Sequence, residues 1–523
     1  MVDSDRLASD RSALASSYDL VPYDSQPFAE AHPNYLGALG VLHGLDCALP
    51  SDCRVLELGC ASGGHLVPLA WFHPGSQFVG IDLSDSQVRV GRELVDALGL
   101  KNCTLHAGDL SDFDPGPEGF DYIIAHGLYS WVSAPVRDAI LALCRRALRR
   151  GGVAYISYNA LPGWRMRGLT RDLLDWHLRG IADPLQRFRH AKALIDRIGS
   201  AVDTDAPSSY LEMEVSRILG NPPSYLAHEY LEPDNQAFLL QEFVDDASRA
   251  GLRYLCNADL STGFPELYGS VGAVLSDLAD DPVGREQYLD FVASRAFRQS
   301  LLCRDDEAPT TLDPRHLLPL SLLADLLPAP KLDLRRAKPQ TFSSRDGTGF
   351  EVCLPLCKAA VAELAACFSR AVPCADLLGR AAQRVVARGD ARHADASDEA
   401  LDEIFSLVVL QHVEPCLESR DSTVNPCGLP RAITLAQRQA GLGWSHLATA
   451  THRCVELDEF SRTLVGQLDG TRDAAGLARF MAEWLQVHAG HGFTVQEHMP
   501  KHVQSQVSRL LKLFARHGLL EQL

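Results

Sequence analysis

The residues best suited to hold a reactive ligand form a short glycine-rich segment, Glu57-x-Gly59-x-Ala61-x-Gly63. It follows an apolar, β-branched run and precedes an apolar stretch, so the sequence predicts a strand, a tight turn and a helix start. Small residues let the backbone approach a ligand closely, and the first turn of a helix directs unpaired N–H groups at it. A nucleotide-like ligand is the first hypothesis, and a turn that binds nothing is the alternative.

The spacing of this segment argues against two common nucleotide chemistries. It differs from the Gly-x-Gly-x-x-Gly of dinucleotide-binding folds, and no Gly-Lys-Ser/Thr follows it. The spacing therefore argues against hydride transfer with a dinucleotide cofactor and against a phosphate-binding loop.

Two more acidic residues stand where predicted strands end. Asp82 closes the apolar run that begins at Phe78, and its carboxylate can accept two hydrogen bonds from ribose hydroxyls. The alternative role for Asp82 is a helix cap, which Ser84 can already supply. Asp109 follows the third strand, where it is placed for an adenine amino group, although a lone Asp in a turn is often structural. Together with Glu57, these carboxyl groups predict a nucleoside site.

A sheet is needed to bring these residues together. Apolar strands alternate with helices: the expected strands are 53–58, 77–82, 102–106, 120–125 and 153–158, and the expected helices begin at 64 and span 85–98 and 134–148. Such strands predict a parallel sheet with helices on both faces, and ligands bind such sheets beyond the carboxyl ends of the strands.

Two aromatic-rich loops follow the fourth and fifth strands. They are His126-Gly127-Leu128-Tyr129-Ser130-Trp131 and Tyr158-Asn159-Ala160-Leu161-Pro162-Gly163-Trp164. Either loop alone is more often simple packing. Because both leave the same edge of the predicted sheet, we expect them to meet beside the ligand.

These motifs together resemble a known family. The Glu57 segment is similar to the first motif of class I S-adenosylmethionine-dependent methyltransferases, with Ala61 in place of the middle glycine. The two aromatic loops resemble those of bacterial methyltransferases that carry a methyltransferase regulatory domain, a group that includes protein-lysine methyltransferases of outer-membrane proteins. The resemblance continues through 228–231, 287–291 and 297–302.

The resemblance implies S-adenosylmethionine as the cofactor and assigns two sets of residues. The expected cofactor-binding residues are Tyr23, Glu57, Gly59, Cys60, Ala61, Gly63, Asp82, Leu83, Asp109, Leu110, Ala125 and His126. The expected acceptor site comprises His126, Tyr129, Trp131, Tyr158, Asn159 and Trp164. Aromatic walls can cage an amine that approaches a sulfonium. We expect no metal ion.

The expected activity is in-line methyl transfer to a lysine amine of a protein or peptide. A desolvated amine beside a sulfonium can lose its proton, so His126 or Tyr129 need only orient it. With a hydroxyl substrate, His126 becomes the general-base candidate. Two alternatives stay open: a small-molecule or natural-product N- or O-methyltransferase, and a cofactor-binding scaffold without turnover.

The chain of 523 residues is long enough for several domains. We expect an α/β, Rossmann-like methyltransferase domain, followed by mostly α-helical, winged-helix-like modules. The expected bounds are 1–304 for the methyltransferase domain, with a helical insertion at 165–224 and a regulatory-type segment at 225–304; 305–345 for a linker; and 346–420 and 421–523 for the two modules. The second module resembles peptide-binding modules; passive dimerisation or stabilisation is the alternative.

The bulk composition limits the partners. With 49 Lys and Arg against 67 Asp and Glu, the formal net charge is −18, which opposes nucleic-acid binding. The 14 cysteines are scattered and are expected to be reduced thiols. No apolar run is long enough to cross a bilayer, and the N-terminus lacks the apolar core of a secretory signal, so we expect a cytoplasmic protein without membrane insertion. The composition leaves the oligomeric state open.

Overall fold

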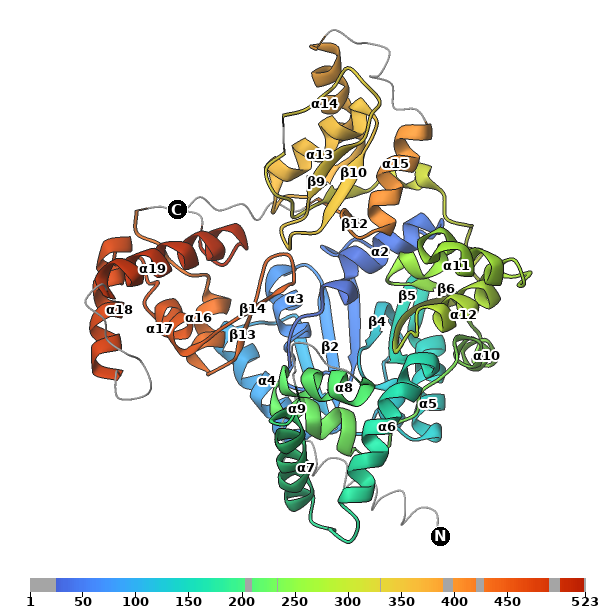
Figure 1. Ribbon diagram of the computed structural model, residues 1–523, viewed down its shortest axis with the longest axis vertical. Helices are drawn as coiled ribbons and strands as arrows, with labels where there is room; N and C mark the ends of the chain where they lie inside the picture. Colours follow the sequence, from blue (N-terminus) through green and yellow to red (C-terminus); the bar gives the residue numbers. More distant parts are fainter. Residues whose placement is uncertain are drawn as a thin grey trace.

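The computed structural model describes residues 25–202, 209–232, 234–329, 331–388, 398–419, 428–488 and 499–521. A large sheet lies at the centre, with a helical projection at one end and two smaller modules beside it (Figure 1). None of the helices in these segments has both the length and the apolar character needed to span a membrane.

The central sheet has seven strands in the order β3-β2-β1-β4-β5-β7-β6. Their bounds are β1 Arg54–Leu58, β2 Gln77–Asp82, β3 Cys103–Ala107, β4 Phe120–Ala125, β5 Leu148–Asn159, β6 Leu252–Asn257 and β7 Phe297–Arg304. Strands β1 to β5 pair in parallel, whereas β7 runs antiparallel between β5 and β6. The predicted parallel α/β sheet is therefore confirmed and closes with an antiparallel strand.

Helices cover both faces because successive strand residues point to opposite sides. Val55 belongs to the core shared with α2 (Pro33–Leu42), α3 (Leu66–Phe72) and α4 (Asp85–Leu98). Leu56 belongs to the opposite core, under α5 (Ala134–Ala147) and α10 (Leu240–Arg249). This alternation decides which side chains can reach the ligand edge.

A helical insertion projects from the sheet after β5 (Figure 1). It comprises α6 Leu161–His177, α7 Pro184–Gly199, α8 Tyr210–Leu219, α9 Pro223–Leu226 and a π-helical turn, Ala227–Leu231. Its apolar side chains, among them Leu174, Ile195 and Tyr230, form a core of their own. The insertion thus folds as a distinct bundle, and α6 begins four residues before the expected boundary at 165.

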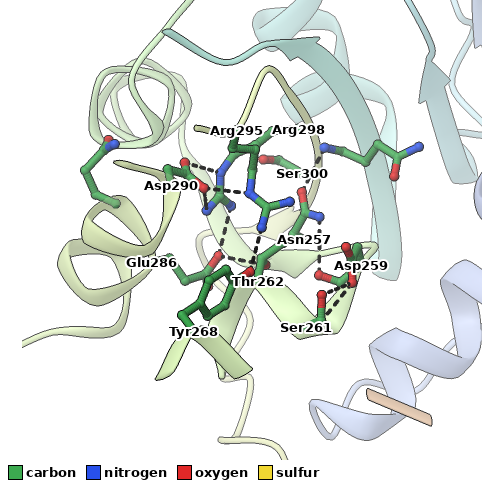
Figure 2. A network of polar contacts seen from close by, with 12 residues as sticks. Asn257, Asp259, Ser261, Thr262, Tyr268, Glu286, Asp290, Arg295, Arg298 and Ser300 are labelled. Atoms are coloured by element: carbon green, nitrogen blue, oxygen red, sulfur yellow. Dashed lines mark hydrogen bonds and ion pairs between the residues drawn. The ribbon is translucent and has the colours of Figure 1, made fainter. Parts of the chain in front are cut away.

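An ion-pair network anchors β7 inside the segment that follows the insertion (Figure 2). Arg298 is fully buried and pairs with Asp290 at 2.7 Å and Glu286 at 2.9 Å, both on α12 (Pro282–Val292). Arg295 pairs with the same Asp290 at 2.8 Å. Because an unpaired buried charge is costly, these contacts hold β7 in its register between β5 and β6.

The middle of the chain corrects one expectation. Residues 305–345 were expected to form a linker, but they contain β8 (Ser321–Leu323) and β9 (Gln340–Ser343). Strand β8 is the centre of a three-stranded sheet with β11 (Val372–Pro373) and β12 (Glu414–Cys416). The proline-rich composition suggested a linker, and strands of three or four residues are too short to show the alternation of apolar and polar residues that would have predicted them.

The rest of this middle module packs directly on the methyltransferase domain. Hairpin β9-β10 crosses the expected boundary at 345, and three helices follow; these elements are β10 Gly349–Val352, α13 Pro355–Cys367, α14 Cys374–Val386 and α15 Asp398–Val409. Side chains such as Leu322 and Leu356 share one continuous apolar core with Val55 and Tyr155 of the large sheet. The middle module therefore depends on the sheet for its stability.

The C-terminal module has a separate core, to which Leu464, Met481 and Phe514 contribute. Its elements are α16 Thr434–Gly441, β13 His446–Ala448, β14 Cys454–Glu456, α17 Glu459–Gly466, α18 Ala474–His488 and α19 Met499–Arg516. Strands β13 and β14 pair as an antiparallel hairpin, called here the wing hairpin (446–456), which points toward the large sheet (Figure 1).

Candidate cofactor and acceptor site

The turn after β1 adopts backbone conformations that suit a close ligand. Gly59 and Gly63 have φ of +75° and +73°, and Ala61 has φ of +47°. Left-handed conformations are unfavourable for residues with a Cβ, so a non-glycine residue held there points to a functional constraint. The turn leads directly into α3.

Asp82 ties this turn to the end of β2. Its Oδ2 accepts the Ala61 N–H at 2.8 Å, and its Oδ1 accepts the Ser84 N–H at 2.9 Å. Each carboxylate oxygen has a second lone pair, so both can still accept ribose hydroxyls. Asp82 therefore fits a structural and a binding role together.

Glu57 is the buried carboxyl group of the site. It is 4% exposed, and its Oε2 has no hydrogen-bond partner within the described chain. Burial, reinforced by the nearby Asp82 charge, raises the pKa of Glu57 well above its usual range. A buried oxygen without a donor is costly, so the site fits a ligand that brings a donor, such as the α-amino group of S-adenosylmethionine.

Four other residues that were expected to bind the cofactor lie at the ends of strands β2, β3 and β4. Asp109 and Leu110 begin a short turn after β3, where Asp109 Oδ1 accepts the Ser111 N–H at 2.8 Å. Leu83 is exposed beside Asp82, and Ala125 is fully buried at the end of β4. All four lie at the carboxyl ends of neighbouring parallel strands.

The side chain of Cys60 points away from this edge. It is buried, and a Cβ added to Gly80 would lie 2.7 Å from its Sγ. Only the backbone of Cys60 is therefore available to a cofactor. The remaining predicted residue, Tyr23, lies outside the described residues.

An N-terminal strap, residues 25–31, crosses the glycine turn. The Gly64 N–H donates to Ser25 Oγ at 2.7 Å, and the Phe28 N–H donates to His65 Nδ1 at 3.2 Å. A Cβ on Gly64 would lie 2.2 Å from the Ser25 carbonyl oxygen. The strap therefore requires glycine beneath it, which the sequence motif alone did not reveal.

His126 lies under this strap. Its ring stacks on Phe28 with centroids 3.7 Å apart, and its Nδ1 is 2.9 Å from the Tyr155 hydroxyl. Burial lowers the pKa of His126 to about 4, so the imidazole is neutral near pH 7. It can orient an amine without adding a positive charge beside a sulfonium.

Two expected acceptor residues lie elsewhere. Tyr129 and Tyr158 are buried in the core beneath α10, where Tyr158 stacks on Phe243 with centroids 4.3 Å apart and bonds Ser300 at 3.0 Å. For Tyr158 the reason is strand alternation: Tyr155 and Tyr158 differ by an odd number of positions, so they face opposite sides of the sheet. Tyr129 lies in a short 3-10 turn after β4 and packs against Phe238 and Phe243 instead. The prediction that these two tyrosines wall the acceptor site is wrong.

The remaining acceptor candidates stabilise the junction with the helical insertion. Trp131 and Trp164 pack edge to face with centroids 6.1 Å apart, and Arg167 lies 5.0 Å from the Trp164 ring. Asn159 is buried and its amide donates to Asn235 Oδ1 at 3.2 Å. These contacts account for the three residues without a substrate, so only His126 of the acceptor set lies beside the turn.

The wing hairpin reaches the same place from the C-terminal module. His452 Nε2 lies 2.9 Å from His65 Nδ1, at the start of α3. The Cys454 thiol lies 3.6 Å from the Pro27 carbonyl oxygen of the strap. The C-terminal module therefore contacts both the strap and the start of α3, next to the turn after β1.

In the segments with described side chains, no group of three or more His, Cys, Asp or Glu is arranged to hold a metal ion.

Comparisons with known proteins match three regions of the chain. A family described as a methyltransferase domain matches residues 55–152, a predicted methyltransferase regulatory domain matches 222–304, and the C-terminal winged helix domain of PKMT, a protein lysine methyltransferase, matches 429–519. The uncharacterised protein RP028 of Rickettsia prowazekii is 34% identical over 241 residues, which are 46% of this chain and 96% of RP028.

The chain belongs to the family of bacterial methyltransferases that carry a methyltransferase regulatory domain. A second R. prowazekii protein, RP789, is 38% identical over 296 residues, 55% of this chain but only 53% of RP789, about half its length. The structure of PKMT2 from Rickettsia typhi in complex with AdoHcy superposes with a TM-score of 0.78 at 23% identity, over 95% of this chain and 100% of that one. The predicted family and the Rossmann-like methyltransferase fold with a C-terminal winged helix are thereby confirmed.

Proposed function

We propose that this chain transfers the methyl group of S-adenosylmethionine to a lysine amine of a protein. The observation that carries the proposal is an acidic cavity of about 990 Å³ that is lined in part by Ala29 and Glu30 of the strap and by Gln299 of β7. The methyltransferase domain, the middle module and the wing hairpin all contribute to its wall. A space bounded by three parts of the chain suits an extended polypeptide better than a compact metabolite.

The charge of this cavity favours a basic substrate. Five carboxylate residues and two arginines line it: Glu30, Asp259, Asp325, Asp346, Glu414, Arg345 and Arg453. Both arginines are already engaged, because Arg345 pairs with Asp325 at 3.3 Å and Arg453 with Glu414 at 3.0 Å. The remaining acidic charge attracts a lysine and its basic neighbours.

The chemistry requires a neutral amine aligned with the methyl group. When bound, S-adenosylmethionine supplies an electrophilic methyl group on a sulfonium. Glu57, Asp82 and the turn after β1 would hold its polar groups, and His126 would accept an N–H of the amine. Desolvation under the strap, together with the neighbouring sulfonium, lowers the pKa of the amine from about 10.4. Positioning then supplies most of the rate, and no dedicated base is required.

A direct assay tests this function. The chain would be incubated with methyl-labelled S-adenosylmethionine and host lysate, and the labelled protein and residue located by mass spectrometry. Label on lysine in polypeptides supports the proposal, whereas label confined to small molecules favours a metabolite methyltransferase. Cofactor binding without any turnover identifies a scaffold.

We also propose that the partner is a polypeptide rather than nucleic acid and that the chain acts in the cytoplasm. The support for the first point is the net charge of −18, which repels polyanions. Gel-shift assays at low salt with duplex DNA and RNA check the first point; retardation at micromolar protein contradicts it. Fractionation of the source cells checks the second, because recovery of the chain in the membrane or extracellular fraction contradicts it.

A further inference from the structure

The Tyr155 hydroxyl is the hydrogen-bond partner of His126, and it does not belong to the residues that the sequence predicts for the site. Tyr155 is fully buried in β5, on the sheet face toward the strap, and its Oη lies 2.9 Å from His126 Nδ1. No hydrogen bond reaches His126 Nε2 from any part of the chain that the structure describes. The second ring nitrogen is thus left for the substrate.

Neighbouring groups fix the Tyr155 hydroxyl. Ser157 and Gln299 face the same side of the paired strands β5 and β7 as Tyr155, and both act on the pKa of its hydroxyl. The Gln299 amide also donates to Glu30 Oε1 of the strap at 2.9 Å. Burial raises the pKa of Tyr155 well above its usual value, so it stays protonated across the physiological range.

The ion pairs of Arg298 support this arrangement from the opposite face. In β7, Arg298 and Ser300 point toward α12 and Tyr158, so Gln299 between them must point toward Tyr155. A register shift of one residue would exchange these faces. The network in Figure 2 therefore fixes the register of β7 and keeps Gln299 on the sheet face that Tyr155 occupies.

We propose that Tyr155 is the positioning residue that holds His126 as the Nδ1–H tautomer, with the Nε2 lone pair directed to the target amine. In this arrangement His126 Nδ1–H donates to Tyr155 Oη, and the Tyr155 O–H turns away from the imidazole, toward Ser157 on the same face of β5. The Nε2 lone pair accepts one N–H of the lysine amine and so aims the nitrogen lone pair at the methyl group. The orientation of the amine rests on the proposed function, whereas the tautomer of His126 does not.

The tautomer is measurable without substrate. In ¹⁵N-histidine-labelled protein, long-range ¹H–¹⁵N spectra assigned with a His126→Gln variant should show His126 protonated at Nδ1. Tyr155→Phe should shift it to the Nε2–H form that free neutral imidazoles favour. Tyr122→Phe is the matched control, because Tyr122 is equally buried in β4 and its hydroxyl donates to the Ala48 carbonyl instead. An Nε2–H tautomer in the wild type would overturn the proposal.

Kinetics provide a second readout. Tyr155→Phe should lower kcat about tenfold or more, the loss expected for one hydrogen bond that orients the reacting group, while the Kd for S-adenosylmethionine stays at the wild-type value. In a His126→Ala background, Tyr155→Phe should cause no further loss, because it acts through the missing ring. Additive losses in the double variant, or unchanged kcat in Tyr155→Phe, would refute the positioning role. A wild type that methylates no lysine at all would refute the proposed function and leave the tautomer result standing.

Discussion

Asp82 and Ala61 are joined by a hydrogen bond of 2.8 Å between the carboxylate at the end of β2 and the N–H of the turn after β1. The carboxylate for which we propose a role in binding ribose also accepts the Ala61 N–H of the turn, which is in a left-handed conformation. Binding and backbone shape are therefore coupled at this residue. Loss of the carboxylate should remove ribose acceptors and relax the turn together.

Asp82→Ala should weaken S-adenosylmethionine binding by roughly 1–3 kcal/mol, the cost of leaving polar groups unpaired. Isothermal titration calorimetry of the folded variant measures the effect. Asp85→Ala is the control, since Asp85 is an exposed carboxylate in the first turn of α4, three residues away. Unchanged affinity in a folded Asp82→Ala protein would remove Asp82 from the site.

Gly64→Ala should displace the strap. The added Cβ would lie 2.2 Å from the Ser25 carbonyl oxygen, a backbone atom that can yield only if the strap moves. We expect the cofactor affinity to fall about tenfold or more, which corresponds to about 1.4 kcal/mol, with the fold retained. Gly168→Ala on α6 has open space around its Cβ and should leave the affinity unchanged. Equal affinities for the two variants would show that the strap does not contribute to binding.

The sequence predicted the local features of the site better than its long-range ones. The turn after β1 and the strand ends at Asp82 and Asp109 follow from motifs of a few residues, and the structure has them at one edge. Tyr155 was missed and Tyr158 misplaced because both lie in one apolar strand, where no polar alternation reveals which face meets the ligand. Strand β8 was missed because three residues are too few to show a period. Its partners, Pro373 and Pro415, lie 50 or more residues away in sequence.

Acid should destabilise the protein partly through its buried histidines. Burial lowers the pKa of His65 to about 3 and of His126 to about 4, both below about 6.5 for an unfolded chain. The unfolded chain then binds more protons below pH 6.5. The free energy of unfolding is therefore undiminished above pH 6.5 and falls as the pH drops toward 4.

His126→Gln should reduce this loss by about 2 kcal/mol between pH 7 and pH 5, since the variant has one histidine fewer to protonate on unfolding. Urea unfolding at the two pH values measures the difference. His190→Gln, which replaces an exposed histidine on α7, serves as the control. A wild-type loss that persists in full in His126→Gln would show that His126 is not protected from protonation.

Neutralising the acidic cavity should weaken the recognition of basic substrates. Asp259→Asn with Asp346→Asn removes two of its five carboxylates while keeping the side-chain shape. The KM for a lysine-rich peptide should rise about threefold to tenfold, and the difference should shrink in high salt because added ions screen exposed charges. Asp277→Asn with Asp280→Asn, at the exposed turn after α11 (Gly269–Ser276), changes the net charge equally away from the cavity. An equal rise in KM for both double variants would assign the effect to overall charge.

The C-terminal module offers the sharpest test of how the parts of the chain cooperate. A chain that ends at Arg304 would expose the core that Leu322 and Leu356 share with the sheet, so it should fold poorly. A chain that ends at residue 419 removes only the module that has its own core, and should fold. It also removes His452 and Cys454, which contact His65 and the strap.

We therefore expect the chain ending at residue 419 to bind S-adenosylmethionine more weakly by about 1 kcal/mol, the net value of a buried hydrogen bond. Its kcat/KM on the polypeptide substrate should fall further, because the cavity loses Arg453 and one of its walls. His452→Ala in the full chain separates the two effects: it should reproduce the loss of cofactor affinity and retain most of the polypeptide affinity. Equal kcat/KM for the shortened and full chains would reduce the C-terminal module to a stabilising appendage and make a small-molecule substrate the stronger interpretation.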